Sequence, residues 1–158
     1  MHPILRVLLL AVLPVALLAA PATEAPATLP DDALRRATLG TWLYEQNAGV
    51  ATVAMYTTYR EDGTAIQLLK TKFLFKKAAG IWIENRWTIR DGAVHLTPVK
   101  FRAHSDDAKI DLDEAVRQIL RLDDKEMVYT LKGTERKELK TATIPDDVQQ
   151  MIAELSKK

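Results

Sequence analysis

Short β-type segments separated by turn signals recur along most of this chain, and their spacing is the strongest constraint on its fold. Asp62-Gly63, Asp91-Gly92 and Lys132-Gly133 are typical of tight hairpin turns, because glycine adopts positive φ angles without a steric penalty. The segments between such turns are rich in β-branched and aromatic residues, as strands are. About eight strands are expected, at residues 39–44, 50–59, 65–75, 81–90, 93–101, 116–122, 126–131 and 134–139.

The segment at residues 81–90 shows the clearest alternation of apolar and polar side chains. Two sets alternate along it: Ile81, Ile83, Asn85, Trp87 and Ile89 on one face, and Trp82, Glu84, Arg86, Thr88 and Arg90 on the other. A period of two predicts a half-buried strand in which one of these faces lines the interior.

Strands joined by hairpins at this regular spacing predict an all-β fold, either a closed antiparallel barrel or a sandwich. The form we expect is an eight-stranded antiparallel up-and-down barrel, because closure removes the unpaired edges of an open sheet. Residues 116–122 also fit a helix, but the turn at 123–125 joins them to another strand-like segment and favours a strand.

A short helix is expected before the strands and a second helix after them. Pro30 precedes two acids and two arginines in the pattern of a helix running to Arg36. Pro145 opens the second helix, at residues 145–157, which carries an apolar stripe of Val148, Met151, Ile152 and Leu155.

The N-terminus predicts an export signal. Arg6 precedes a run of apolar residues from 7 to 20, which is short for a membrane span and typical of a signal peptide. Ala20-Pro21-Ala22 places cleavage after Ala22, so the expected location is periplasmic or secreted, without a stable membrane anchor. An uncleaved anchor is the alternative. The domains are then a signal at 1–22, a linker at 23–30 and a barrel domain with its C-terminal helix at 31–158.

Charge and composition exclude several classes of protein. Removing residues 1–22 takes away Arg6 and no acid, which leaves 21 basic and 21 acidic residues and no net charge. This balance argues against nucleic acid as a partner and against general attraction to anionic lipid. The absence of cysteine excludes disulfides, thiolate zinc sites and thiol catalysis.

The sequence contains no catalytic motif, and no catalytic residue, cofactor or metal site is predicted. His95 and His104 are interpreted as ordinary polar residues. The acidic segment at 106–114 has Lys109 in the middle, where a calcium loop of the EF-hand type requires glycine. An enzyme remains the least favoured interpretation, because fold alone does not determine function.

Four segments together resemble lipocalins and bacterial lipocalin-like domains. Leu39-Gly40-Thr41-Trp42 resembles the G-x-W opening of the family, and residues 59–64 resemble its Y-x-x-D-G-T hairpin. Residues 85–92 resemble its G-x-W-x-I-x-D-G segment, with Asn85 in place of the glycine, and residues 119–136 resemble its closing hairpin. The resemblance implies that Trp42 packs across the barrel floor against Arg136 in a structural role. Arg117 and Arg121 are the alternatives for that arginine.

The barrel and its aromatic residues predict binding of a small apolar or amphipathic molecule in the interior. The alternative is a filled barrel that acts as an envelope protein-interaction module, either an inhibitor or an assembly factor. The residues expected to bind a ligand in the barrel are Trp42, Tyr44, Met55, Tyr56, Ile83, Trp87 and His95.

Overall fold

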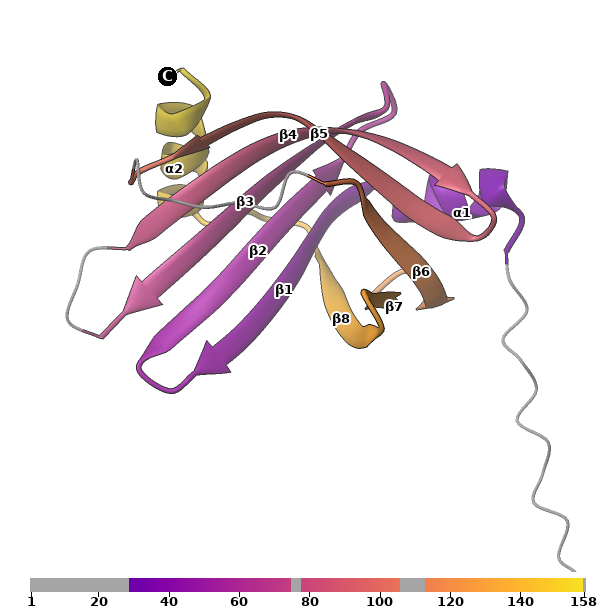
Figure 1. Ribbon diagram of the computed structural model, residues 1–158, viewed down its shortest axis with the longest axis horizontal. Coiled ribbons are helices and arrows are strands. Elements are labelled where there is room, and N and C mark those ends of the chain that lie inside the picture. The colour runs from indigo at the N-terminus through magenta and orange to yellow at the C-terminus, as the bar shows by residue number, and fades with distance from the viewer. Residues whose placement is uncertain (1–28, 75–77, 106–112, 158) are drawn as a thin grey trace, which may run out of the picture.

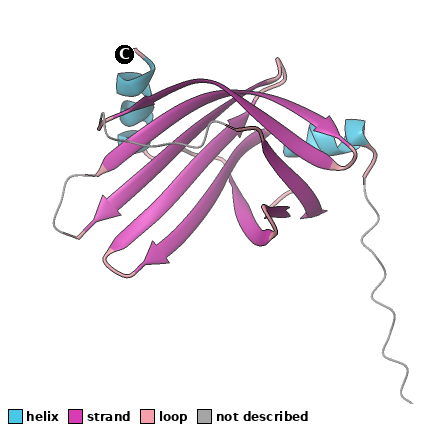
Figure 2. Ribbon diagram, viewed as in Figure 1, coloured by secondary structure: helices cyan, strands magenta, loops and turns pink. Residues whose placement is uncertain are grey.

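The eight strands close into one antiparallel barrel, which confirms the predicted fold class. The computed structural model describes residues 29–74, 78–105 and 113–157. Each strand pairs with the next, and β1 also pairs with β8 (Figures 1 and 2). The elements in order are α1 (Asp31–Thr38), β1 (Gly40–Ala48), β2 (Ala51–Tyr59), β3 (Thr64–Phe73), β4 (Ala79–Arg90), β5 (Ala93–Ala103), β6 (Ala115–Leu122), β7 (Glu126–Leu131), β8 (Thr134–Thr141) and α2 (Asp146–Ser156).

The predicted hairpin turns form as the sequence indicates. Asp91 and Gly92 have φ angles of 53° and 71°, and Lys132 and Gly133 have φ angles of 50° and 77°. Two successive positive φ angles match the right-handed twist of the flanking strands. The segment that also fitted a helix is strand β6, whose Ile119 pairs with Tyr129 of β7.

One extra residue interrupts the long β4–β5 hairpin. Glu84 pairs with Lys100 and Asn85 pairs with Pro98, so Val99 is the inserted residue of a β-bulge. Pro98 has no backbone N–H to contribute to the ladder, and a bulge is one of the few strand positions that tolerate proline. The bulge bends β5 and increases its local twist.

Two short seams separate the barrel into a large and a small part. β5 pairs with β6 only over Ala93–Leu96, and β1 pairs with β8 only over Thr41–Leu43. Figure 1 shows β1–β5 as one long curved sheet, with the shorter β6–β8 facing part of its concave side. The rest of that concave side extends beyond β6–β8.

Helix α1 covers one end of the barrel. The indole N–H of Trp42 donates to the carbonyl of Thr38 at 2.7 Å, and Leu34 is buried among the barrel side chains. The carboxylate of Asp31 accepts from the backbone N–H groups of Asp91 and Gly92 at 3.2 and 3.1 Å. Helix α1 is thereby fixed to β1 and to the β4–β5 turn.

Helix α2 packs against the outside of the barrel rather than its end. Val148 and Leu155 are buried against Leu68 and Trp82 on the outward faces of β3 and β4. This contact explains why a large apolar side chain, Trp82, occupies the outer face of β4, opposite Ile83. The ion pair between Lys70 and Asp147 adds a polar contact beside it.

Candidate functional site

The interior of the barrel is packed near α1 and accessible farther from it. In the packed half, the side chains of Trp42, Tyr59, Trp87 and Met127 are almost fully removed from solvent. The strand registers place a second set of side chains on the same inner surface, and these are only partly buried. We call this set the open half: Tyr44, Val53, Met55, Leu69, Ile81, Ile83 and Phe101.

Polar side chains on three neighbouring strands lie between the packed and open halves. Asn85 donates to the carbonyl of Ala65 at 3.4 Å and to Oε1 of Gln67 at 3.1 Å. The amide of Gln67 donates to Oγ1 of Thr57 at 3.4 Å. Thr57 and Asn85 are fully buried, and these bonds satisfy polar groups that would be costly to bury alone.

A buried ionic network occupies the β6–β8 side of the packed half. The guanidinium of Arg117 donates to the carboxylate of Glu138 at 3.0 Å and to the hydroxyl of Tyr59 at 2.9 Å. The hydroxyl of Tyr129 donates to the same carboxylate at 2.7 Å, and Arg117 lies 4.8 Å from the centre of the Tyr129 ring. Arg117 and Glu138 are 1% and 0% exposed. A buried charge pair of this kind fixes the relative positions of its strands.

Burial and charge shift the pKa values of this network. Burial raises the pKa of the Tyr59 and Tyr129 hydroxyls, because the phenolate would lose its hydration. Burial alone would lower the pKa of Arg117, but the carboxylate of Glu138 and the hydroxyls of Tyr59 and Tyr129 together outweigh it and raise that pKa. Arg117 therefore stays charged and both phenols stay neutral at physiological pH.

The cation over Trp42 is Lys140, not Arg136. Trp42 pairs with Lys140 across the β1–β8 seam, and the Lys140 ammonium lies 5.0 Å from the indole centre. The same ammonium donates to the carbonyl of Ala37 at 3.3 Å. Arg136 is four residues earlier on β8 and lies 5.3 Å from the centre of the Tyr44 ring. The expected pairing of Trp42 with Arg136 is therefore corrected, because the seam register brings Lys140 to that position.

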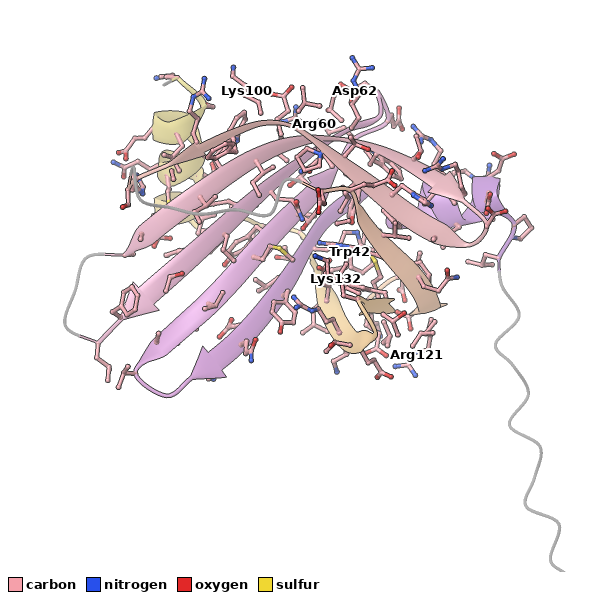
Figure 3. The ribbon with its side chains drawn as sticks, in the orientation of Figure 1. Trp42, Arg60, Asp62, Lys100, Arg121 and Lys132 are labelled. Carbon is pink, nitrogen blue, oxygen red and sulfur yellow. The ribbon has the colours of Figure 1, made fainter. Side chains whose placement is uncertain are left out.

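The structure brings three of the expected ligand-binding residues together in the open half: Tyr44, Met55 and Ile83. Trp42 (Figure 3) and Trp87 lie in the packed half and are almost inaccessible. The placement of the remaining two inside the barrel is wrong. Tyr56 points outward and packs beside α2. His95 also points outward, between the buried Val94 and Leu96, and contacts Arg90 at 2.8 Å and Glu114 at 3.4 Å.

The sequence interpretation missed the buried network. The pattern of β8 gives no local signal for it. Thr134, Arg136, Glu138 and Lys140 share one face of this strand, and a face with three charged residues is typical of a solvated surface rather than an interior.

Surface hollows also lie outside the open half, three of them lined by residues that the structure describes. One of about 450 Å³ is lined by polar groups of the β2–β3 turn and β4, including Asp62 (Figure 3) and Arg86. One of about 180 Å³ lies between α2 and His104, whose Nδ1 accepts from the backbone N–H of Gly80 at 3.0 Å. The third, of about 190 Å³, lies at the tips of β2 and β3 beside the exposed side chains of Val50 and Leu74.

The described residues contain neither a cluster of metal ligands nor a membrane-spanning helix. No group of three or more His, Asp or Glu residues in residues 29–74, 78–105 and 113–157 lies where it could hold a metal ion. Neither of the helices in these ranges has the length and hydropathy to cross a membrane. The expected signal segment and the residues at 106–112 lie outside the described part of the chain.

The geometry defines the class of protein as a small up-and-down β-barrel with one packed and one accessible half. Its topology is compatible with the lipocalin-like fold. Comparison with protein-family models and with curated proteins finds no match for this chain.

Proposed function

We propose that this protein is an exported, lipocalin-like carrier or sensor that binds a small apolar or amphipathic molecule in the open half. The observation that carries this proposal is the contrast in burial along the inner surface. Trp42 and Trp87 are almost completely buried, whereas Met55, Ile81 and Ile83 keep accessible surface. Apolar side chains that stay accessible on a concave surface are the usual lining of a small-molecule site.

A fluorescence titration tests the proposal. N-phenyl-1-naphthylamine is a neutral apolar probe whose emission rises in an apolar environment, and we expect the barrel to bind it. Ile83→Glu places a charge on the accessible inner surface and should weaken binding about tenfold or more, because an apolar ligand would desolvate that charge. Thr88→Glu is the control, since Thr88 is exposed on the outer face of the same strand.

Near-UV circular dichroism of both variants establishes that each is folded. Equal binding by the wild type, Ile83→Glu and Thr88→Glu would place the probe outside the open half. Absence of binding by the folded wild type would contradict the proposed function.

Export is part of the same proposal. The basic residue and apolar run before Ala22 support it, together with the small residues at the expected cleavage position. Mass spectrometry of the protein recovered from the extracellular or periplasmic fraction should find Thr23 at the N-terminus. Recovery of the chain with Met1 from a membrane fraction would contradict it.

A protein-interaction module is the second candidate, and one observation favours it. Val50 and Leu74 are 68% and 69% exposed, and they lie beside each other at the tips of neighbouring hairpins, where the Leu74 N–H donates to the Val50 carbonyl. Affinity capture with the wild type and a Val50→Glu/Leu74→Glu variant tests it. A specific partner binds the wild type and does not bind this variant. It still binds Val99→Glu, the control, which changes another exposed apolar residue.

A further inference from the structure

The inner surface of the barrel carries more positive than negative charge. Along the described strands, the registers place four side chains with a formal charge on this surface: Arg117, Arg136, Glu138 and Lys140. Three of them are basic and one is acidic. All four come from β6 and β8, and the inward-facing residues of β1–β5 are neutral.

Two of the three cations are accounted for by neighbouring groups. The single carboxylate, that of Glu138, is occupied by Arg117 and by the hydroxyl of Tyr129. Lys140 lies at the end covered by α1, over the Trp42 ring, and its ammonium donates to a helix carbonyl.

Arg136 is the remaining cation, and it lies where the open half begins. Its guanidinium lies over the ring of Tyr44, an open-half residue, and this is its only side-chain contact of a polar or charged kind within the described residues. Its Nε, like that of Arg117, is shielded from solvent and has no hydrogen-bond partner among them. Unlike Arg117, Arg136 has no carboxylate beside it within these residues. Within the described residues, the shielded N–H has no acceptor and the partly buried charge has no counter-ion, and each of these conditions raises the free energy of the folded chain.

We propose that the ligand is an amphipathic anion, an apolar chain that ends in a carboxylate, and that Arg136 binds its carboxylate. This inference rests on the proposed function. The planar guanidinium can donate two parallel hydrogen bonds to one carboxylate. The apolar chain would lie against Met55, Leu69 and Ile81, which continue from Tyr44 as a row of paired residues across β2, β3 and β4.

A comparison of three ligands with the same apolar chain tests this inference. Dodecanoate, dodecanol and dodecyltrimethylammonium have apolar chains of nearly equal length and differ in the charge and size of the head group. The affinity for each can be measured by displacement of N-phenyl-1-naphthylamine. The titrations are run below the micelle concentrations at about pH 8, where a free carboxylic acid is ionised. We expect the wild type to bind dodecanoate about tenfold or more tightly than dodecanol, and the cation most weakly.

Arg136→Gln should bring the affinities for dodecanoate and dodecanol close together by weakening the first and sparing the second. Arg136→Lys keeps the charge without the planar fork and should keep part of the preference. Arg86→Gln is the matched control, because Arg86 is exposed on the outer face of β4, and it should behave as the wild type.

The possible outcomes separate this inference from the proposed function. If the wild type binds none of the three ligands and does not bind the probe, the proposed function fails. If it binds dodecanoate and dodecanol equally, or if Arg136→Gln keeps the preference, the inference is overturned and the carrier function stands. If Arg136→Gln weakened the binding of dodecanol as much as that of dodecanoate, Arg136 would have a role in folding rather than in carboxylate binding. That result would also overturn the inference.

Discussion

The guanidinium of Arg117 and the carboxylate of Glu138 meet at 3.0 Å inside the barrel, where neither has access to solvent. This pair joins β6 to β8 across the intervening β7. Its Tyr59 contact extends the connection to β2 on the other side of the interior. The small and large parts of the barrel are therefore linked through a buried network as well as through the two seams.

Breaking this pair should be strongly destabilising. Glu138→Leu leaves the Arg117 charge buried without a counter-ion, and we expect a loss of about 3–5 kcal/mol in the free energy of unfolding. Arg117→Met should cost a similar amount. The double variant should lose clearly less than the sum, because it leaves no unpaired buried charge. Urea unfolding followed by tryptophan fluorescence measures all three, and additive losses would show that the two side chains do not interact.

The two buried tyrosines predict sensitivity to alkaline pH. Burial raises the pKa of Tyr59 and Tyr129 above the ordinary value of 10.0, so the unfolded chain releases these protons at lower pH than the folded chain. Their contribution to stability is complete below about pH 10 and declines as pH rises further. Urea midpoints measured from about pH 8 to pH 11 should fall more steeply for the wild type than for Tyr59→Phe/Tyr129→Phe. Parallel curves for the two proteins would contradict this prediction.

Trp42 and the Lys140 ammonium above its ring should contribute very unequally to the free energy of unfolding. Trp42→Ala removes a fully buried indole and should cost about 3–5 kcal/mol in the free energy of unfolding. Lys140→Met removes an exposed ammonium that lies over the ring, and we expect a loss below about 1 kcal/mol. Thermal unfolding of the two variants measures the difference. A large loss in Lys140→Met would mean that the ammonium holds α1 in place through its bond to Ala37.

Gly80 permits the close approach of α2 to the barrel. A Cβ atom at this position would overlap the Sδ atom of Met151 and come within 3.3 Å of Nδ1 of His104. Gly80→Ala should therefore destabilise the fold by about 1–3 kcal/mol, as overpacking does. Shortening the opposing side chain in Gly80→Ala/Met151→Ala should give a smaller loss than the two single changes together. If the losses of the two single variants simply added in the double variant, the strain in Gly80→Ala would not come from contact with Met151.

The strands could be predicted from the sequence because the signals that specify them are local. Asp91-Gly92 indicates a turn without reference to any distant residue, and the alternation around Ile83 and Trp87 separates the two faces of β4. The apolar stripe of α2 is equally local. Its docking on the outside of the barrel depends on the outward orientation of Trp82, which the sequence leaves undecided between two faces.

The site was harder to predict because strand faces and seam register determine it. Met55 and Tyr56 are adjacent in one strand and must point to opposite sides, so strict use of the period of two would have excluded one of them. The same rule excludes His95 from the interior, because its neighbours Val94 and Leu96 are apolar and point inward. The position of Arg136 over Tyr44 depends on how β8 meets β1, and no local pattern specifies that register.

The β1–β8 seam also bears on the order in which the chain folds. The seam contains three residue pairs, and the hydrogen bond from Lys140 to Ala37 beside it joins groups 103 positions apart. Closing so long a loop costs conformational entropy, whereas the β1–β5 hairpins need only neighbouring segments. We expect amides of β2–β4 to gain protection in pulsed hydrogen exchange before those of β8. Until the last strand arrives, the nascent chain is a half-barrel whose first strand has an unpaired edge, open to addition of a strand from another molecule.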